Sequence, residues 1–272
     1  MHASVAALWR YPVKSMLGEE IATSALGERG ISGDRAYALV DEETGLVASA
    51  KRPGRWGMLF GCRARFLEPP DDGAAPPPVE ITLADGSTIR SDATDVDDVL
   101  SRVVGRAVRL TTSAPATAMI DEVDAEAPDV VDQTQIALGA PGTFFDGLPI
   151  HLLTTASLAT LATASPDAHF DVRRFRPNVV IECDDDGFVE DRWVDQTVTV
   201  GAASVYVLMS TPRCVMTTLA QSDLPDDRSI LRTITDRNTV DIPGMGPRSC
   251  VGVYGLVTAA GHVATGDVVA LA

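Results

Sequence analysis

One cysteine at the end of an apolar strand is the residue best suited to chemistry in this chain. Cys214 follows Arg213 within the stretch Ser210–Thr218, directly after the strongest strand signal of the C-terminal half, Val198–Met209. A guanidinium beside a thiol favours the thiolate, which is the form that attacks electrophiles and ligates soft metals. Taken alone, however, a single cysteine near a strand is more often an inert part of the core.

A second group of side chains offers positive charge and hydrogen-bond donors. Five basic or polar residues from three separate loops each lie at the end of a predicted strand: Lys14, Ser15, Arg35, Arg176 and Asn178. If these strand ends converge, the residues form a site for a phosphorylated or polyanionic ligand. Lys14 by itself is more often a solvated loop lysine. The basic loop 51–55 is either plain surface or a further contact to an anion.

The elements that must position these residues are mainly short strands. Val79–Leu83 and Thr88–Arg90 flank an Asp-Gly turn and predict a hairpin, and Met58–Leu67 is a further strand candidate. The apolar residues of Asp95–Val104 have helical spacing. With two or three helices, several hairpins and no βαβ alternation, the sequence predicts a β-rich α+β protein.

Composition excludes several classes of function. The chain has 272 residues, of which 45% are hydrophobic, so it can form a substantial core. Its formal net charge of −16 repels nucleic acid and anionic membranes. Its 4 cysteines lie far apart, which excludes zinc-ribbon spacing, and the P-loop, GxGxxG, HExxH and Gly-x-Ser-x-Gly motifs are absent. Without a signal-peptide or membrane-spanning run, we expect a cytoplasmic protein.

The same loops carry motifs through which the chain resembles a known family. Five segments stand in the family's order: Leu8–Ser15, Gly33–Arg35, Phe175–Asn178, Arg213-Cys214 with Thr217-Thr218, and Val253–Gly255. The first two resemble the MOSC N-terminal β-barrel domain, and the other three resemble the MOSC domain. The closing segment Gly261–Leu271 also fits.

The resemblance implies a MOSC-type β-barrel core, an N-terminal β-barrel-like domain and a few peripheral helices. We place the N-terminal domain at residues 1–112 and the MOSC domain at residues 113–272. The boundary region is 113–133, because this stretch is acidic and only weakly periodic.

The resemblance also implies a cofactor. The chain is similar to the mitochondrial amidoxime-reducing component and its bacterial relatives, which bind a molybdenum cofactor through a pterin dithiolene and one protein cysteine. The matching ligand here is Cys214. By the same matching, Lys14, Ser15, Arg35, Arg176 and Asn178 hold the pterin and its phosphate, while Arg213 and Tyr254 line the pocket. The implied reaction is the two-electron reduction of N-hydroxylated compounds with cleavage of the N–O bond.

The chain departs from the family pattern in two respects. Pro212 stands where a serine that hydrogen-bonds the cofactor is expected. No ferredoxin-like segment follows the MOSC motifs and no anchor precedes Ala7, so we expect a separate electron donor, either a reductase or a ferredoxin-like protein, for a small N-hydroxylated substrate.

Three other interpretations of Cys214 stay open at this point. It carries a persulfide in sulfur transfer, or it holds the molybdenum cofactor in a non-catalytic carrier, or it only fills the core of a β-rich domain. Molybdenum content separates the cofactor proteins from the others, and reduction of a benzamidoxime-type substrate separates the reductase from the carrier.

Overall fold

The computed structural model describes residues 3–71, 73–112, 119–123, 131–135, 144–145 and 147–272, and for 122–123 and 131–135 it describes the backbone alone. The chain divides into two compact units. Unit 1 comprises residues 1–9, 20–32 and 148–272, and unit 2 comprises residues 10–19 and 33–147. In the described part of the chain, no helix is both long and apolar enough to cross a membrane.

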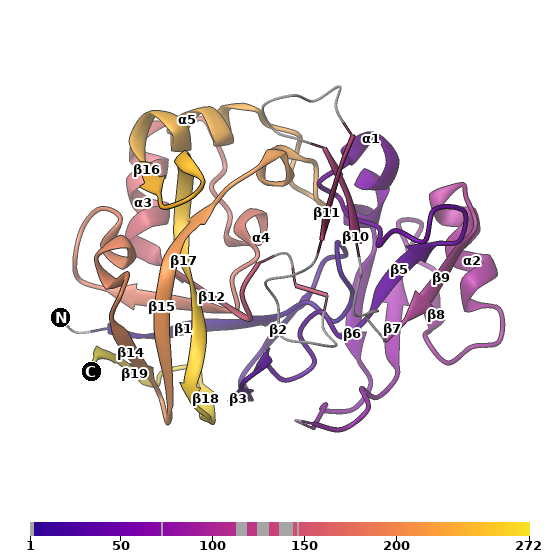
Figure 1. Ribbon diagram of the computed structural model, residues 1–272, viewed down its shortest axis with the longest axis horizontal. Coiled ribbons are helices and arrows are strands. Elements are labelled where there is room, and N and C mark those ends of the chain that lie inside the picture. The colour runs from indigo at the N-terminus through magenta and orange to yellow at the C-terminus, as the bar shows by residue number, and fades with distance from the viewer. Residues whose placement is uncertain (1–2, 72, 113–118, 124–130, 136–143, 146) are drawn as a thin grey trace. The chain divides into compact units, whose positions relative to one another are not determined.

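Unit 1 is built on a closed barrel of seven strands (Figure 1). Around the barrel, the order is β12, β13, β1, β19, β14, β15 and β17, and β17 closes it by pairing with β12. These strands are β1 (Ala3–Arg10), β12 (Ile150–Thr154), β13 (Val179–Cys183), β14 (Thr197–Val200), β15 (Ala203–Pro212), β17 (Gly246–Ala259) and β19 (Val268–Leu271). The predicted β-rich α+β fold with a barrel core is therefore confirmed.

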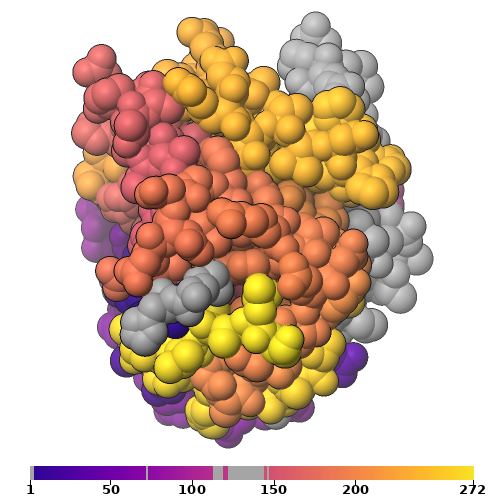
Figure 2. Space-filling model, turned by 90° about the vertical axis from the view of Figure 1, so that its left-hand side faces the viewer, coloured from indigo at the N-terminus to yellow at the C-terminus, as the bar shows by residue number. Residues whose placement is uncertain are grey.

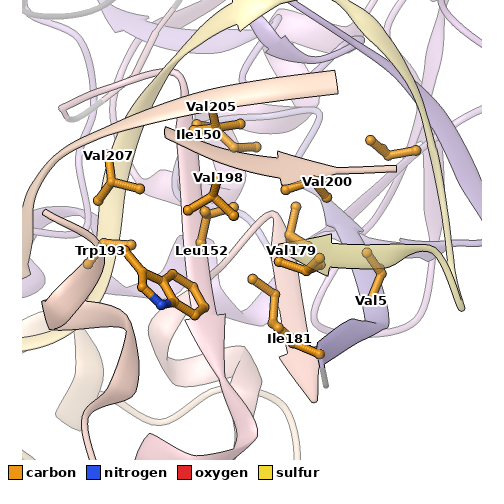
Figure 3. Packing of buried hydrophobic residues seen from close by; sticks show 14 of the residues in the cluster. Val5, Ile150, Leu152, Val179, Ile181, Trp193, Val198, Val200, Val205 and Val207 are labelled. Atoms are coloured by element: carbon orange, nitrogen blue, oxygen red, sulfur yellow. The ribbon is translucent and has the colours of Figure 1, made fainter. Parts of the chain in front are cut away.

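The barrel closes around a core of β-branched side chains. Figure 3 shows Val198, Val205 and Val207 directed toward Ile150 and Leu152 from neighbouring strands, with the Trp193 ring at one end. Strands such as β14 alternate half-buried and buried residues, as expected for one apolar and one outer face. Burial of this valine-rich face is the main stabilisation of the barrel.

Shorter elements surround the barrel. β16 (Thr239–Ile242) pairs with β17, and β2 (Glu19–Ile21) pairs with β1. A separate sheet contains β18 (Gly261–Ala264), β3 (Thr23–Gly27) and β4 (Gly30–Ile31). Figure 2 views the side where β19 pairs with β14, with yellow C-terminal residues among the orange residues of β14 and β15.

The helices of unit 1 connect barrel strands. They are α3 (Thr155–Ala164), α4 (Val172–Phe175), α5 (Ser229–Arg237) and the 3₁₀ helices η2 (Val189–Trp193) and η3 (Val215–Thr218). Since β12 and β13 are parallel and joined through α3 and α4, they form a βαβ unit. One isolated unit leaves no repeating pattern in the sequence, which is why the sequence shows no βαβ alternation.

Unit 2 consists of small sheets and short helices. Its strands are β5 (Ala38–Asp41), β6 (Arg63–Phe66), β7 (Val79–Thr82), β8 (Thr88–Arg90), β9 (Val108–Thr111), β10 (Met119–Val123) and β11 (Val131–Gln135), and its helices are α1 (Pro53–Trp56), η1 (Gly57–Gly61) and α2 (Val96–Val104). The pairs are β5 with β9, β10 with β11, and β7 with both β6 and β8. The β7–β8 hairpin and α2 confirm the sequence predictions for these segments.

Two predicted strands were wrong in detail. Met58–Leu67 begins with η1 and becomes a strand only at β6. Val198–Met209 is a hairpin of β14 and β15 rather than one strand, because the chain reverses at Gly201. Gly201 has φ +56°, and a Cβ there would lie 2.3 Å from Oδ2 of Asp267, so the turn requires glycine.

Candidate cofactor site

Cys214 lies where β15 passes into η3. It is a half-buried free thiol with extended backbone, and its carbonyl accepts hydrogen bonds from both the amide and the hydroxyl of Thr217, at 3.1 and 3.0 Å. The neighbouring Pro212 pairs with Cys250 on β17. Burial raises the pKa of Cys250 to about 12, so that thiol is a neutral core group. Of these two sulfurs from one strand pair, Cys214 is the accessible one.

Arg213 is fixed at its backbone and at one end of its guanidinium. Its amide donates to the Ser249 carbonyl at 2.8 Å, and its Nη2 donates to the Phe175 carbonyl at 2.7 Å. The guanidinium lies 5.7 Å from the centre of the Phe175 ring. Its Nε and Nη1 are buried and have no hydrogen-bond acceptor among the described residues. Two charged N–H groups in this situation need a further acceptor, which a bound ligand can supply.

Arg176 is held by the end of α4. Its amide bonds to the Val172 carbonyl, and its backbone has the left-handed conformation with φ 54° and ψ 47°. This conformation is uncommon for a residue with a side chain and turns the chain sharply before β13. The same short turn therefore supplies the Phe175 carbonyl, which accepts a hydrogen bond from Arg213, and it also fixes the backbone of Arg176.

Asn178 uses its side chain to join two barrel strands. Its Oδ1 accepts from the His151 amide at 3.1 Å, and its Nδ2 donates to the Trp9 carbonyl at 3.4 Å. Its own amide and carbonyl bond to the same two residues. The asparagine thus fixes the ends of β12 and β1, which makes positioning its evident structural role.

His151 and Tyr254 form a ring pair beside this strand end. They are opposite residues on β12 and β17, with ring centres 5.3 Å apart. Gly252 makes the arrangement possible, because a Cβ at this position would lie 2.3 Å from His151 Nε2. Tyr254 was named from the sequence, but His151 was not.

Lys14 and Ser15 are buried in unit 2 rather than exposed. Nζ of Lys14 donates to the Phe144 carbonyl at 3.0 Å, and Oγ of Ser15 accepts from the Ala50 amide at 3.0 Å. The interpretation of Lys14 as a solvated loop lysine was therefore wrong. Burying an ammonium is costly, so a lysine with no solvent access points to a specific role.

Arg35 is brought next to Lys14 and Ser15 by backbone pairing. The Lys14 amide bonds to the Tyr37 carbonyl, and the Arg35 amide bonds to the Tyr11 carbonyl, both at 2.8 Å. The Arg35 guanidinium pairs with Asp34 and lies 4.6 Å from the centre of the Tyr11 ring. Unit 2 thus brings together its three predicted residues.

Backbone strain coincides with the predicted residues. In the part of the chain that the structure describes, five residues other than glycine have positive φ: Ser15, Arg35, Arg176, Asp195 and Ser222. Three of them were singled out from the sequence for cofactor binding, with φ values of 65°, 47° and 54° for Ser15, Arg35 and Arg176. Such strain persists where the surroundings hold a residue in a required direction, and it is concentrated at functional sites.

The basic loop 51–55 has an internal partner. Arg52 and Arg55 both donate to the carboxylate of Asp121, at 2.8 and 2.9 Å, and Nε1 of Trp56 donates to it at 2.9 Å. Burial by itself raises the pKa of Asp121, but these hydrogen bonds outweigh it and hold the pKa below the ordinary value. The anion expected at this loop is therefore the chain's own carboxylate.

The predicted residues fall into two groups, one in each unit: Arg176, Asn178, Arg213, Cys214 and Tyr254 in unit 1, and Lys14, Ser15 and Arg35 in unit 2. The unit 1 group fits a cofactor that has a soft metal and acceptor atoms. An accessible thiol suits the metal, and the two buried N–H groups of Arg213 suit a phosphate, carbonyl or ring nitrogen.

Comparison with curated proteins finds distant relatives. Over 238 residues, the chain is 26% identical to mitochondrial amidoxime reducing component 2 of Macaca fascicularis and equally to that of Homo sapiens. The match takes in 79% of this chain and 66% of each relative, so the chain spans just under two thirds of their length.

The solved structures that match are more distant in sequence. The YuaD protein from Bacillus subtilis has a TM-score of 0.47 at 13% identity, with 99% of this chain and 94% of that chain covered. YiiM from Geobacillus stearothermophilus has a TM-score of 0.31 at 17% identity, with 58% and 74% covered.

Family models match both parts of the sequence in which the motifs stand. The model of the MOSC N-terminal beta barrel domain matches residues 2–59, and the MOSC domain model matches residues 141–270. The chain therefore belongs to the MOSC family, with a MOSC domain preceded by a MOSC N-terminal beta barrel domain.

Proposed function

We propose that this chain binds a molybdenum cofactor through Cys214 and reduces N-hydroxylated compounds with electrons from a separate protein. The observation that carries the proposal is the accessible Cys214 thiol next to Arg213, whose buried Nε and Nη1 require an acceptor. The 26% identity to the amidoxime reducing components supports the same conclusion. When bound, the cofactor supplies the two-electron chemistry of N–O cleavage.

The residues of the chain hold and orient this group. Cys214 provides one thiolate, which suits molybdenum because soft ligands bind soft metals. Arg213 donates to the acceptor atoms of the pterin, and Arg176 contributes positive charge from a fixed backbone turn. Asn178 acts indirectly, by fixing the strand ends on which Arg176 and His151 stand.

The unit 2 residues are proposed to hold the phosphate. Lys14 and Arg35 carry positive charge, and the backbone segments on which they stand are hydrogen-bonded to each other. Ser15, which follows Lys14, has a strained backbone with positive φ. Replacement of either cation by glutamine should lower the amount of molybdenum in the purified protein, without change in the unit 1 barrel. Tyr254 is proposed to line the pocket beside His151.

The electron donor is part of the same proposal. With a net charge of −16, the chain attracts a donor that has a basic docking face, so electron transfer should slow as salt is added. The cytoplasmic location expected from the composition also belongs to this proposal.

Reduction of benzamidoxime with an artificial electron donor tests the function directly. We expect turnover by the wild-type protein and none by Cys214→Ser, which keeps a small polar side chain but replaces the soft ligand. Molybdenum without turnover in the wild type would instead indicate a cofactor carrier. Sulfur released by cyanide from a molybdenum-free wild type would indicate a persulfide on Cys214.

A further inference from the structure

Arg174 is a buried arginine to which the family motifs assign no role. It lies on α4, two residues before Arg176, and it has no exposed surface. Its guanidinium donates four hydrogen bonds to backbone carbonyls: Nε to His169 at 2.9 Å, Nη1 to Thr217 at 3.1 Å and to Leu219 at 3.2 Å, and Nη2 to Pro225 at 2.7 Å. One side chain thus joins three separate stretches of backbone.

The chemistry of this contact requires arginine. A guanidinium is a planar fork with five N–H donors and a permanent charge, so it can reach carbonyls in several directions at once. Burial lowers the pKa of Arg174, which shows that the charge is held at a cost. A residue that only filled the core would be apolar, so this charge has a specific structural task.

The carbonyls that Arg174 binds belong to the segment that presents Cys214. The Cys214 carbonyl accepts hydrogen bonds from the amide and hydroxyl of Thr217. Arg174 donates hydrogen bonds to the carbonyls of Thr217 and Leu219 on the same turn. Further along, the Asp227 amide bonds to the Thr218 carbonyl. The segment 214–227 is therefore tied to α4 just after the thiol.

The same turn also holds the chain just before the thiol. Phe175 is the next residue of α4. Its carbonyl accepts a hydrogen bond from Nη2 of Arg213, and its ring lies against the same guanidinium. The segment around Cys214 is thus fixed to α4 on both sides, through residues 213 and 217. Because Arg176 follows directly, α4 sets the position of the thiol relative to Arg176.

We propose that Arg174 is the positioning residue of Cys214, and that its guanidinium holds the segment 214–227 so that the thiol keeps one direction relative to Arg176. The importance of that direction for metal binding rests on the proposed function. The mechanical part of the proposal, that Arg174 holds the segment in place, does not depend on the cofactor.

Amide hydrogen exchange of the full-length protein as purified tests the mechanical part. The test variant is Arg174→Gln, with Arg174→Lys as a second variant that keeps the charge but not the fork. The matched control is Arg90→Gln, because this exposed arginine pairs with Asp92 and lies outside the segment. Val205→Ala, in the barrel core, controls for general loss of stability.

The amides of Thr217, Leu219 and Asp227 report on the segment because each is hydrogen-bonded within it. In both Arg174 variants, we expect them to exchange at least about tenfold faster, since hydrogen bonds to a charged donor are lost. The amides of β14 and β15 should change much less. Arg90→Gln should leave all these rates unchanged, and Val205→Ala should not single out the segment.

Two results would overturn the proposal. One is unchanged exchange at Thr217, Leu219 and Asp227 in Arg174→Lys and Arg174→Gln. The other is an equal acceleration throughout the barrel, which would make Arg174 a general stability residue. Molybdenum content of the same samples extends the test, because we expect loss in Arg174→Gln and retention in Arg90→Gln. A wild type without molybdenum would contradict the proposed function, whereas hydrogen exchange would still decide the role of Arg174.

Discussion

The surroundings of the four cysteines separate one thiol from the others. Burial raises the pKa of Cys62, Cys183 and Cys250, so their thiolates are disfavoured near neutral pH. Cys214 is half-buried and stands directly after Arg213 at the exit of a barrel strand. A ligand for a soft metal has to be reachable, and among the four thiols Cys214 combines partial exposure with a neighbouring arginine.

Gly252 is predicted to be essential for the strand end near the site. Its φ is +78°, and a Cβ would lie 2.3 Å from His151 Nε2 and 2.7 Å from the Leu152 carbonyl oxygen. Gly252→Ala should therefore combine backbone strain with overpacking and lower the free energy of unfolding by about 2–5 kcal/mol. Urea unfolding followed by tryptophan fluorescence measures this loss.

Gly266 supplies the matched control, because its φ is +90° and a Cβ there would meet no atom within 4 Å. Gly266→Ala should show the cost of strain alone, about 1–2 kcal/mol. Equal losses in the two variants would contradict the packing that we describe between Gly252 and His151.

At the residue scale, the sequence indicated the charged and thiol residues but not their supports. Lys14, Arg35 and Arg176 stand out as basic residues at strand ends in an acidic chain. Arg174 does not, because its partners are backbone carbonyls, which leave no trace in the identity of other residues. The Asp121 partner of Arg52 and Arg55 was missed since it lies far away in the sequence.

At the scale of elements, a buried carboxylate links η2 to the beginning of α3. Glu190 is fully buried and accepts from the hydroxyls of Thr154 and Ser157 at 2.5 and 2.7 Å. Thr154 also caps α3 by accepting from the Ser157 amide. Burial raises the pKa of Glu190 to about 6, because desolvation outweighs the hydrogen bonds.

Glu190 should therefore make stability depend on pH. Since its folded pKa of about 6 exceeds the ordinary value of 4.5, the folded state binds more protons between these pH values, and stability falls as pH rises through this window. Glu190→Gln removes the titration. The free energy of unfolding of Glu190→Gln minus that of the wild type should therefore increase by about 2 kcal/mol from pH 4.5 to pH 7. Urea titrations at both pH values measure the difference, and an unchanged difference would show that Glu190 does not titrate in this range.

Elements with a regular apolar pattern could be predicted from the sequence. Turns and strand pairings that depend on residues distant in sequence could not. The β7–β8 hairpin and the helix α2 have clear patterns and were found nearly to the residue. The β14–β15 turn was missed, because Gly201 is needed there for contact with Asp267, which is distant in sequence. The closure of the barrel by β12 and β17 likewise depends on pairing between distant segments.

At the scale of the whole molecule, the two compact units are not consecutive in sequence. The chain enters unit 2 at residue 10, returns to unit 1 for residues 20–32, and enters unit 1 finally at residue 148. A linear division into 1–112 and 113–272 cannot express this order, and it stays a prediction about the family domains. The expected boundary region 113–133 lies in large part outside the described residues.

Unit 2 depends on the buried carboxylate of Asp121. Asp121→Asn should cost about 3–5 kcal/mol, because it leaves Arg52 and Arg55 without their buried counter-charge. Since the folded pKa of Asp121 lies below its ordinary 3.8, its contribution is present above that pH and is lost as the solution becomes more acidic. Thermal unfolding at pH 7 measures the effect.

Asp92 provides the control for Asp121, since its ion pair with Arg90 is exposed on both sides. Asp92→Asn should cause no measurable change in the unfolding temperature. If Asp121→Asn were equally harmless, the three donors around that carboxylate would not stabilise unit 2.

The central claim is that Cys214 ligates molybdenum. Its most direct test is metal analysis of wild-type protein and Cys214→Ala, purified side by side from cells supplied with molybdate, with Cys183→Ala as the control for loss of a thiol. We expect about one molybdenum per chain in the wild type and in Cys183→Ala, and nearly none in Cys214→Ala. Full molybdenum retention by Cys214→Ala would contradict the claim.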